Sequence, residues 1–172
     1  MTNPTDPPLS AAVLRRRIRW LLAFFMLALL ASGLTAFPLL AEMELLARGL
    51  GIPPQANPAD FTGLQHWIAL VRTGLRDTDA RYPFIAYGTD WLAFAHIILA
   101  VLFLGPWRDP VRNVWVIHFG LFACVAVIPL ALICGHIREI PFSWRLLDCS
   151  FGIFGFIPLR LVRRYTRQLS AI

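Results

Sequence analysis

The chain has 172 residues, of which 58% are hydrophobic and only 15% are charged. Soluble domains carry about 25% charged residues, so this balance excludes an ordinary water-soluble domain. The formal net charge of +6 comes from sixteen arginines without any lysine, and the arginines cluster beside apolar runs. That arrangement is typical of membrane orientation rather than of nucleic-acid binding.

The N-terminal segment, residues 1–19, is predicted to be a disordered, basic cytoplasmic lead, because it combines prolines and polar residues with a closing cluster of arginines. The apolar run 20–41 follows directly. It is about twice as long as the apolar core of a signal peptide, so we expect a retained first span.

Three further apolar runs each approach the roughly 20 residues that a helix needs to cross a hydrocarbon core of about 30 Å. They cover residues 88–106, 113–135 and 142–162. The last run is the least apolar, because Arg145, Asp148 and Arg160 lie inside it or at its edges. We therefore predict an all-α fold, an integral membrane four-helix bundle in which residues 20–162 form a single four-span domain.

The long connection between the first two spans contains a predicted amphipathic helix. Apolar residues recur there at i, i+3, i+4, i+7 and i+11, with polar residues between them. They are Leu64, Trp67, Ile68, Val71 and Leu75. Asn57 and Pro58 provide a start signal for this helix. We expect it to lie along the outer membrane interface or to cap the bundle.

The arginines also predict the orientation of the spans. Ten lie in the lead, the 107–112 turn and the C-terminal segment, and six lie in the other two connections. Because loops rich in arginine stay on the cytoplasmic side, both termini are predicted to be cytoplasmic, with residues 163–172 as a basic tail.

Polar residues inside the spans predict one outward-facing pocket. Ionisable groups in a membrane are costly and become functional candidates when they face the bundle interior. At about 1.5 Å per residue, Thr35, His96 and Asp148 lie at similar depth, below more superficial polar residues. The predicted pocket comprises Thr35, Glu42, Asp90, His96, Arg145 and Asp148.

Two interpretations of this pocket are open. In the first it binds a ligand or handles protons, with His96 and Asp148 as its deepest members. In the second Asp148 pairs with Arg145 three residues away, and His96 bonds to a backbone or hydroxyl acceptor. The polar groups then only fix the packing of the helices.

A haem or a metal ion is a further alternative. His96 and His118 differ in depth by about 10 Å and are not expected to share one iron. A metal could use His96, Asp148, His136 or Cys149, although their spacing forms no local motif. The three cysteines include no C-x-x-C and predict no disulfide framework.

Two resemblances bear on these alternatives. His66-Trp67 with Thr73-Gly74-Leu75 faintly resembles the His-Trp and Thr-Gly-Leu pattern of membrane cytochrome b subunits, which implies haem ligation by His66. In those subunits the histidine lies in a true span, whereas here the helix is amphipathic and carries Arg72 and Arg76.

The C-terminal half resembles a family of small bacterial four-span inner-membrane proteins to which no activity is assigned. The resemblance rests on Tyr82-Pro83-Phe84, Gly88-Thr89-Asp90-Trp91, residues 108–113, Ile140-Pro141-Phe142 and residues 144–152. It implies a bacterial inner (plasma) membrane.

Three functions remain as hypotheses. The first is a binding or accessory subunit of a larger membrane assembly, in contact with a membrane-protein partner or a second copy of itself. The second is a small membrane enzyme that acts on a lipophilic substrate, with Asp148 and His96 exchanging a proton. The third is a transporter or channel, which four spans could build only as an oligomer.

Overall fold

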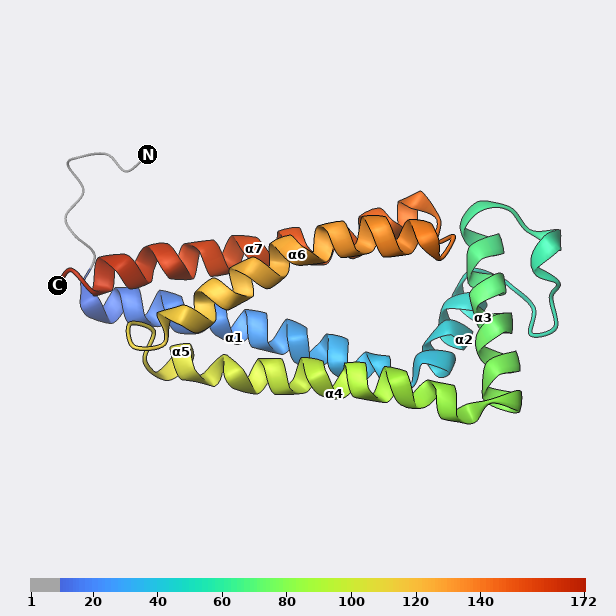
Figure 1. The fold of residues 1–172 in the computed structure, drawn as a ribbon, viewed down its shortest axis with the longest axis horizontal. Helices are drawn as coiled ribbons and strands as arrows, with labels where there is room; N and C mark the ends of the chain where they lie inside the picture. Colours follow the sequence, from blue (N-terminus) through green and yellow to red (C-terminus); the bar gives the residue numbers. More distant parts are fainter. Residues whose placement is uncertain (1–9) are drawn as a thin grey trace. The chain divides into compact units, whose positions relative to one another are not determined.

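The computed structural model describes residues 10–172, and every regular element in that range is a helix (Figure 1). The α-helices are α1 (Ala11–Ala36), α2 (Leu39–Gly49), α3 (Gly63–Arg81), α4 (Tyr87–Leu102), α5 (Leu104–Arg108), α6 (Val114–Ile137) and α7 (Phe142–Leu169). Two short 3-10 helices are η1 (Pro58–Asp60) and η2 (Pro83–Ala86). The predicted all-α class is therefore confirmed.

The first helix begins earlier than the predicted span. The prediction of a disordered lead is wrong for residues 11–19, which form the first turns of α1. Leu14 and Ile18 are spaced by four residues and are both buried, so apolar packing holds this basic segment in the helix. Residues 1–9 of the predicted lead lie outside the described residues.

The end of the first predicted span is also different. The apolar run continues to residue 41, but α1 ends at Ala36 and α2 begins at Leu39. Pro38 explains the break, because proline has no N–H to donate and disfavours a helical residue before it. Residues 39–49 consequently form a separate helix that the hydrophobic pattern does not reveal.

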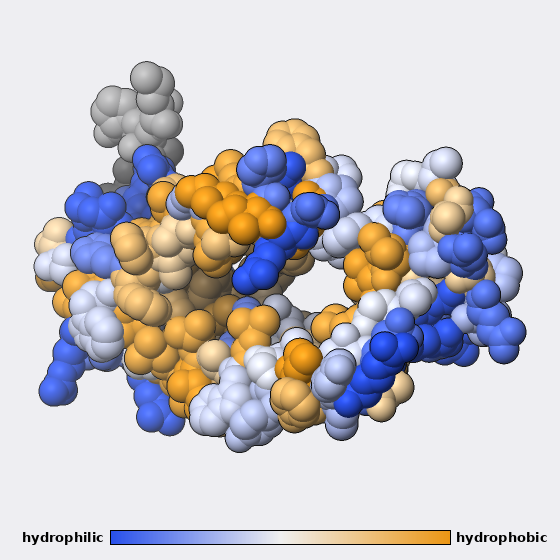
Figure 2. Space-filling model, turned by 45° about the vertical axis from the view of Figure 1, so that its right-hand side comes forward, coloured by the Kyte–Doolittle hydropathy of each residue, from blue (hydrophilic) through white to orange (hydrophobic). Residues whose placement is uncertain are grey.

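Three helical segments among the described residues are long and apolar enough to cross a membrane: Ala11–Ala36, Pro83–Arg108 and Val114–Ile137. Large apolar side chains on them are widely exposed, as expected of a surface that faces lipid (Figure 2). Examples are Phe24, Trp91 and Phe122. These segments are compatible with a multi-pass membrane protein.

The described chain divides into two compact units, and the division falls within α1 and α4. The α6–α7 unit combines the chain up to Ala28 with the chain from Ala100 onwards. The α2–α3 unit runs from Leu29 to Leu99. Each unit is described by itself.

In the α6–α7 unit, α6 and α7 lie side by side and antiparallel (Figure 1). Glycines set their separation: a Cβ atom added to Gly152 would collide with the carbonyl oxygen of Cys124, and one on Gly155 would lie 2.9 Å from the Cys124 Sγ. Small residues allow helix backbones to approach closely in membranes. Gly152 and Gly155 therefore allow α6 and α7 to pack closely.

Arginines gather at one end of the α6–α7 unit. The guanidinium of Arg17 lies 5.7 Å from the ring centre of Tyr165 in α7, and that of Arg19 lies 5.3 Å from the ring centre of Trp107 in α5. These contacts join the start of α1 to the end of α7 and to α5. The three arginine-rich segments predicted to be cytoplasmic thus share one end of this unit.

In the α2–α3 unit, the predicted amphipathic helix is present as α3, packed against α2. Its buried face differs from the predicted apolar stripe: Ile68 is buried, but the Leu64 side chain is 54% exposed and Arg72 only 2% exposed. Asn57 caps η1 instead of α3, its side chain accepting a hydrogen bond from the Ala59 N–H at 3.0 Å. The start signal was therefore assigned to the wrong helix.

Arginine side chains tie α3 to the connection that precedes it. Arg72 donates hydrogen bonds to the carbonyl oxygens of Ile52 at 3.4 Å and Pro53 at 2.8 Å. Arg76 forms an ion pair with Glu44 of α2 at 2.5 Å and also bonds to the Pro54 carbonyl. The side of α3 that the sequence assigns to solvent is therefore the side that holds this unit together.

Candidate functional site

The six predicted pocket residues are divided between the two units. Thr35, Glu42, Asp90 and His96 belong to the α2–α3 unit, whereas Arg145 and Asp148 belong to the α6–α7 unit. The structure therefore allows two partial sites to be described, each within its own unit.

His96 lies half-buried on α4, where α1 approaches closely. Its Nδ1 lies 2.8 Å from the Leu92 carbonyl oxygen one turn earlier, and because a carbonyl oxygen only accepts, Nδ1 is the donor of this hydrogen bond. A Cβ atom on Gly33 of α1 would lie 2.8 Å from the Ala93 carbonyl oxygen and 3.1 Å from the His96 Cβ. The backbone hydrogen bond that the second interpretation expects of His96 is therefore formed.

Thr35 and Glu42 have local roles near the junction of α1 and α2. The Thr35 hydroxyl donates to the Ser32 carbonyl at 3.2 Å, within the last turns of α1. Glu42 lies in the first turn of α2, where a carboxylate is favoured by the helix dipole.

Asp90 lies at an open, aromatic hollow of about 300 Å³. Its lining consists of Phe37, Tyr87, Asp90, Trp91 and Phe94. Tyr87 and Trp91 pack edge to face with ring centres 6.0 Å apart, and Trp91 meets Phe94 in the same way. Around Asp90 the structure therefore places aromatic side chains where the sequence predicts a polar pocket. The reason is that Tyr87, Trp91 and Phe94 share one face of α4 with Asp90.

Arg145 lies in the first turn of α7 and reaches back to α6. Its Nη1 donates to the Leu132 carbonyl at 3.3 Å, and its guanidinium stands 5.3 Å from the ring centre of Phe142. The predicted Arg145–Asp148 ion pair is not formed, since Arg76–Glu44 is the one ion pair within 4.0 Å across residues 10–172. The guanidinium bonds to a backbone carbonyl oxygen of α6 instead.

Asp148 is half-buried on α7, next to the buried Cys149. The Cys149 thiol lies 3.9 Å from the Ile128 carbonyl oxygen of α6, a contact that a weak S–H donor makes. Asp148 lies about one turn after Arg145 along α7, in the part of the helix that packs along α6.

The histidines of the haem and metal alternatives lie on separate elements. His66 is on α3, and its Nδ1 lies 2.8 Å from the Pro58 carbonyl oxygen. His118 and His136 are exposed near opposite ends of α6, about 27 Å apart along the helix axis. Over the described range, no group of three or more His, Cys, Asp or Glu side chains is arranged to hold a metal ion.

Gly135 gives Arg145 the space to cross α6. A Cβ atom at Gly135 would lie 2.6 Å from Arg145 Cδ and 2.7 Å from its Cγ. Gly135→Ala is expected to destabilise the protein by about 1–3 kcal/mol, because the arginine stem must move. In an Arg145→Ala background the same change should cost less than about 0.5 kcal/mol. Thermal unfolding of all four proteins in detergent measures this coupling, and additive effects would contradict the contact.

Comparison with known proteins finds no matching family model, no similar curated protein and no similar solved structure. The function proposed below therefore depends on the residues of this chain.

Proposed function

We propose that this chain is a four-span inner-membrane protein of bacteria, with both termini cytoplasmic, that acts as a binding or accessory subunit of a larger membrane assembly. The part outside the proposed spans, residues 39–86, forms the docking surface. The observation that carries this role is the bracing of α2 and α3 into a folded unit that still exposes large apolar side chains.

The packing of α7 along α6 supports α7 as the fourth span. Contacts run from Gly135 with Arg145 at one end to Gly120 with Leu159 at the other. The 15 residues between these glycines of α6 cover about 22 Å, most of a hydrocarbon core. Phe151 and Phe154 of α7 are 65% and 68% exposed, as lipid-facing side chains would be.

The gathering of arginines at one end of the α6–α7 unit supports cytoplasmic termini. Cys134 is exposed near the other end of α6 and can report the orientation directly. A membrane-impermeant maleimide applied to intact spheroplasts is expected to label Cys134, and Cys134→Ser should abolish the signal. In the Cys134→Ser background, a cysteine placed at Ser170 should react only after lysis. The reverse pattern would contradict the proposed orientation.

The connections around α3 form a rigid base for docking. Gln65 donates to the Leu50 carbonyl at 3.0 Å, and the Ile52 N–H donates to the Ala47 carbonyl at 2.9 Å. Together with the bonds of Arg72 and Arg76, these contacts order the 50–56 connection. Ordered surfaces lose less conformational entropy on binding than flexible ones do.

Apolar side chains on this base provide the contact area. Leu45 of α2 is 67% exposed, and Leu46, Leu64 and Leu70 are also exposed. Exposed apolar groups on an ordered element are typical of protein or membrane interaction sites. Because arginine and carboxylate groups accompany them on α2 and α3, we propose a protein partner with its own polar rim.

Site-directed photo-cross-linking in whole cells tests this role. A photoreactive amino acid at Leu45 or Leu64 is expected to give one discrete adduct of the same mass, while the same group at the exposed Ala80 should not. An adduct of twice the chain mass would identify a second copy as the partner. Lipid adducts alone at both leucines would contradict a docking role.

A further inference from the structure

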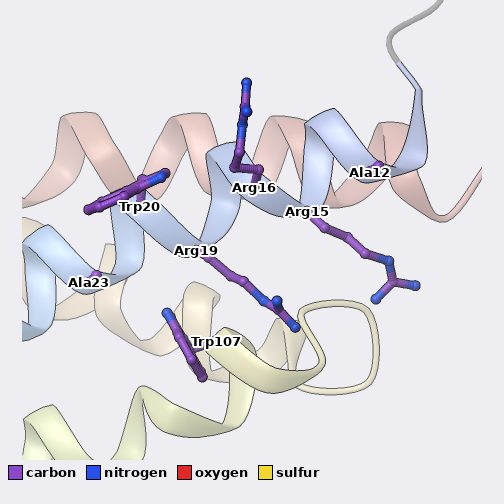
Figure 3. Close-up of a pocket in the computed structure, with 7 residues that line it drawn as sticks. All are labelled: Ala12, Arg15, Arg16, Arg19, Trp20, Ala23 and Trp107. Atoms are coloured by element: carbon purple, nitrogen blue, oxygen red, sulfur yellow. The ribbon is translucent and has the colours of Figure 1, made fainter.

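A groove lies along the first turns of α1, at the arginine-rich end of the α6–α7 unit (Figure 3). Its volume is about 570 Å³. The lining consists of Ala12, Arg15, Arg16, Arg19, Trp20, Ala23 and Trp107. Arg15 and Arg19 extend toward the side where Trp107 lies, and Arg16 and Trp20 extend from the other side of α1 (Figure 3).

The groove carries positive charge that the described carboxylates do not neutralise. Its lining includes three arginines and no acidic residue, and the ion pair found in residues 10–172 is Arg76–Glu44 in the other unit. Arg15 and Arg19 are one helical turn apart, a spacing at which like charges repel. An anion bound between the two guanidinium groups would relieve this repulsion.

The geometry of the arginines suits a phosphate group. A guanidinium presents a planar fork of N–H donors that binds phosphate oxygens in bidentate fashion. The Arg19 guanidinium is held over the Trp107 ring, with its carbon 5.3 Å from the ring centre. This cation–π contact restricts the side chain to the groove and so prepares it for binding.

The rest of the lining is apolar and suits a lipid. Ala12 and Ala23 have small side chains that leave the groove open along α1. The Trp20 side chain is 73% exposed at the start of the first apolar run, the level at which tryptophans lie in the headgroup region of a membrane. An occupant with a negative head and an apolar tail matches both parts of the groove.

We propose that this groove binds the phosphate of an anionic phospholipid of the cytoplasmic leaflet. Arg15 and Arg19 hold the phosphate, Trp107 positions Arg19, and Trp20 contacts the glycerol and upper acyl region. The inference uses the membrane placement of α1 and is independent of the partner-binding role proposed for α2 and α3. It assigns one bound anionic phospholipid to this site, beyond general attraction of arginines to a negative surface.

The test compares bound lipids by native mass spectrometry of the full chain in a neutral detergent. Phosphatidylglycerol and phosphatidylcholine with identical acyl chains are the probes, so the headgroup charge is the variable. The double variant Arg15→Gln/Arg19→Gln removes the proposed ligands. The control Arg164→Gln/Arg167→Gln removes the same charge from exposed positions near the end of α7.

We expect the wild-type chain to retain one phosphatidylglycerol in preference to phosphatidylcholine. The groove variant should lose this preference by roughly tenfold, and the control by less than about twofold. Because all four replaced arginines are exposed, both variants should elute as folded protein. If both variants lost the phosphatidylglycerol preference equally, the binding would be diffuse charge attraction and the proposed site would be wrong. If the groove variant kept the preference, the site would also be wrong.

A final arm separates a lipid from a free anion. Inorganic phosphate added at the concentration of the lipid should leave phosphatidylglycerol bound, because it lacks the apolar contacts of Trp20. Displacement by inorganic phosphate at equal concentration would overturn the lipid assignment.

Discussion

Replacing Gly152 with alanine is expected to lower the free energy of unfolding by about 2–4 kcal/mol. The added methyl group would collide with the Cys124 carbonyl oxygen and approach the Val127 Cγ1 to 2.7 Å. A backbone carbonyl cannot rotate away as a side chain can, so α6 and α7 must separate locally. Such separation breaks the close packing that holds helices together in lipid. Thermal or denaturant unfolding in mild detergent, followed by tryptophan fluorescence, measures the loss.

Gly74→Ala is the matched control for this change. Gly74 lies inside α3, and a Cβ atom there would meet no other atom within 4 Å. Alanine is favoured over glycine in a helix by up to about 1 kcal/mol, so the control should be neutral or slightly more stable. If the free energy of unfolding of Gly152→Ala stayed within about 0.5 kcal/mol of the wild-type value, the close antiparallel packing of α6 on α7 would be contradicted.

Much of the fold follows from hydrophobic length and helix-breaking residues. Long apolar runs predict helices because an apolar segment must satisfy its own backbone hydrogen bonds. The weak point is the junction at Pro38, where apolar character continues although the helix stops. The apolar run predicts one continuous span over residues 20–41. In the structure this run contains the end of α1 and the start of α2.

The candidate site was less predictable, because side-chain direction depends on packing. Arg145 could pair with Asp148 by spacing alone, yet it turns to the carbonyl of Leu132, which only the α6–α7 packing brings near. Gly33 and Gly135 matter because they have no side chain. Gly33 leaves space for His96, and Gly135 leaves space for Arg145, and the sequence does not identify either neighbour. Asp90 lines a hollow whose aromatic neighbours depend on the course of α1 and α4 within the α2–α3 unit, which the sequence does not specify.

Arg72 was the side chain whose role the periodicity most clearly concealed. An arginine between apolar positions is assigned to the solvent face of an amphipathic helix. Here the connection 50–56 supplies carbonyl groups that need donors, and prolines 53 and 54 cannot provide N–H groups of their own. A buried guanidinium with several donors meets that need.

Replacing Arg72 with methionine is therefore expected to destabilise the α2–α3 unit by about 2–4 kcal/mol. Methionine keeps much of the apolar volume, but it removes the side-chain donor of the Ile52 carbonyl oxygen. It also leaves the Pro53 carbonyl oxygen with the Ala56 N–H as its remaining donor. Hydrogen exchange in residues 50–62 should become faster by at least roughly tenfold, since 1.4 kcal/mol corresponds to a factor of ten. Exchange in α6 should stay unchanged, because that helix belongs to the other unit.

Two further variants separate hydrogen bonding from charge. Arg72→Lys keeps the charge, but a single ammonium group replaces the two guanidinium nitrogens that now bond to separate carbonyls, so it should recover only part of the protection. Arg81→Met removes a charge from the exposed last turn of α3 and should change exchange in residues 50–62 by less than about twofold. Full recovery by lysine would mean that charge alone stabilises the connection. An effect of Arg81→Met as large as that of Arg72→Met would remove the special role of the buried guanidinium. Partial recovery with a silent control would identify the fork of Arg72 as the element that orders the proposed docking surface.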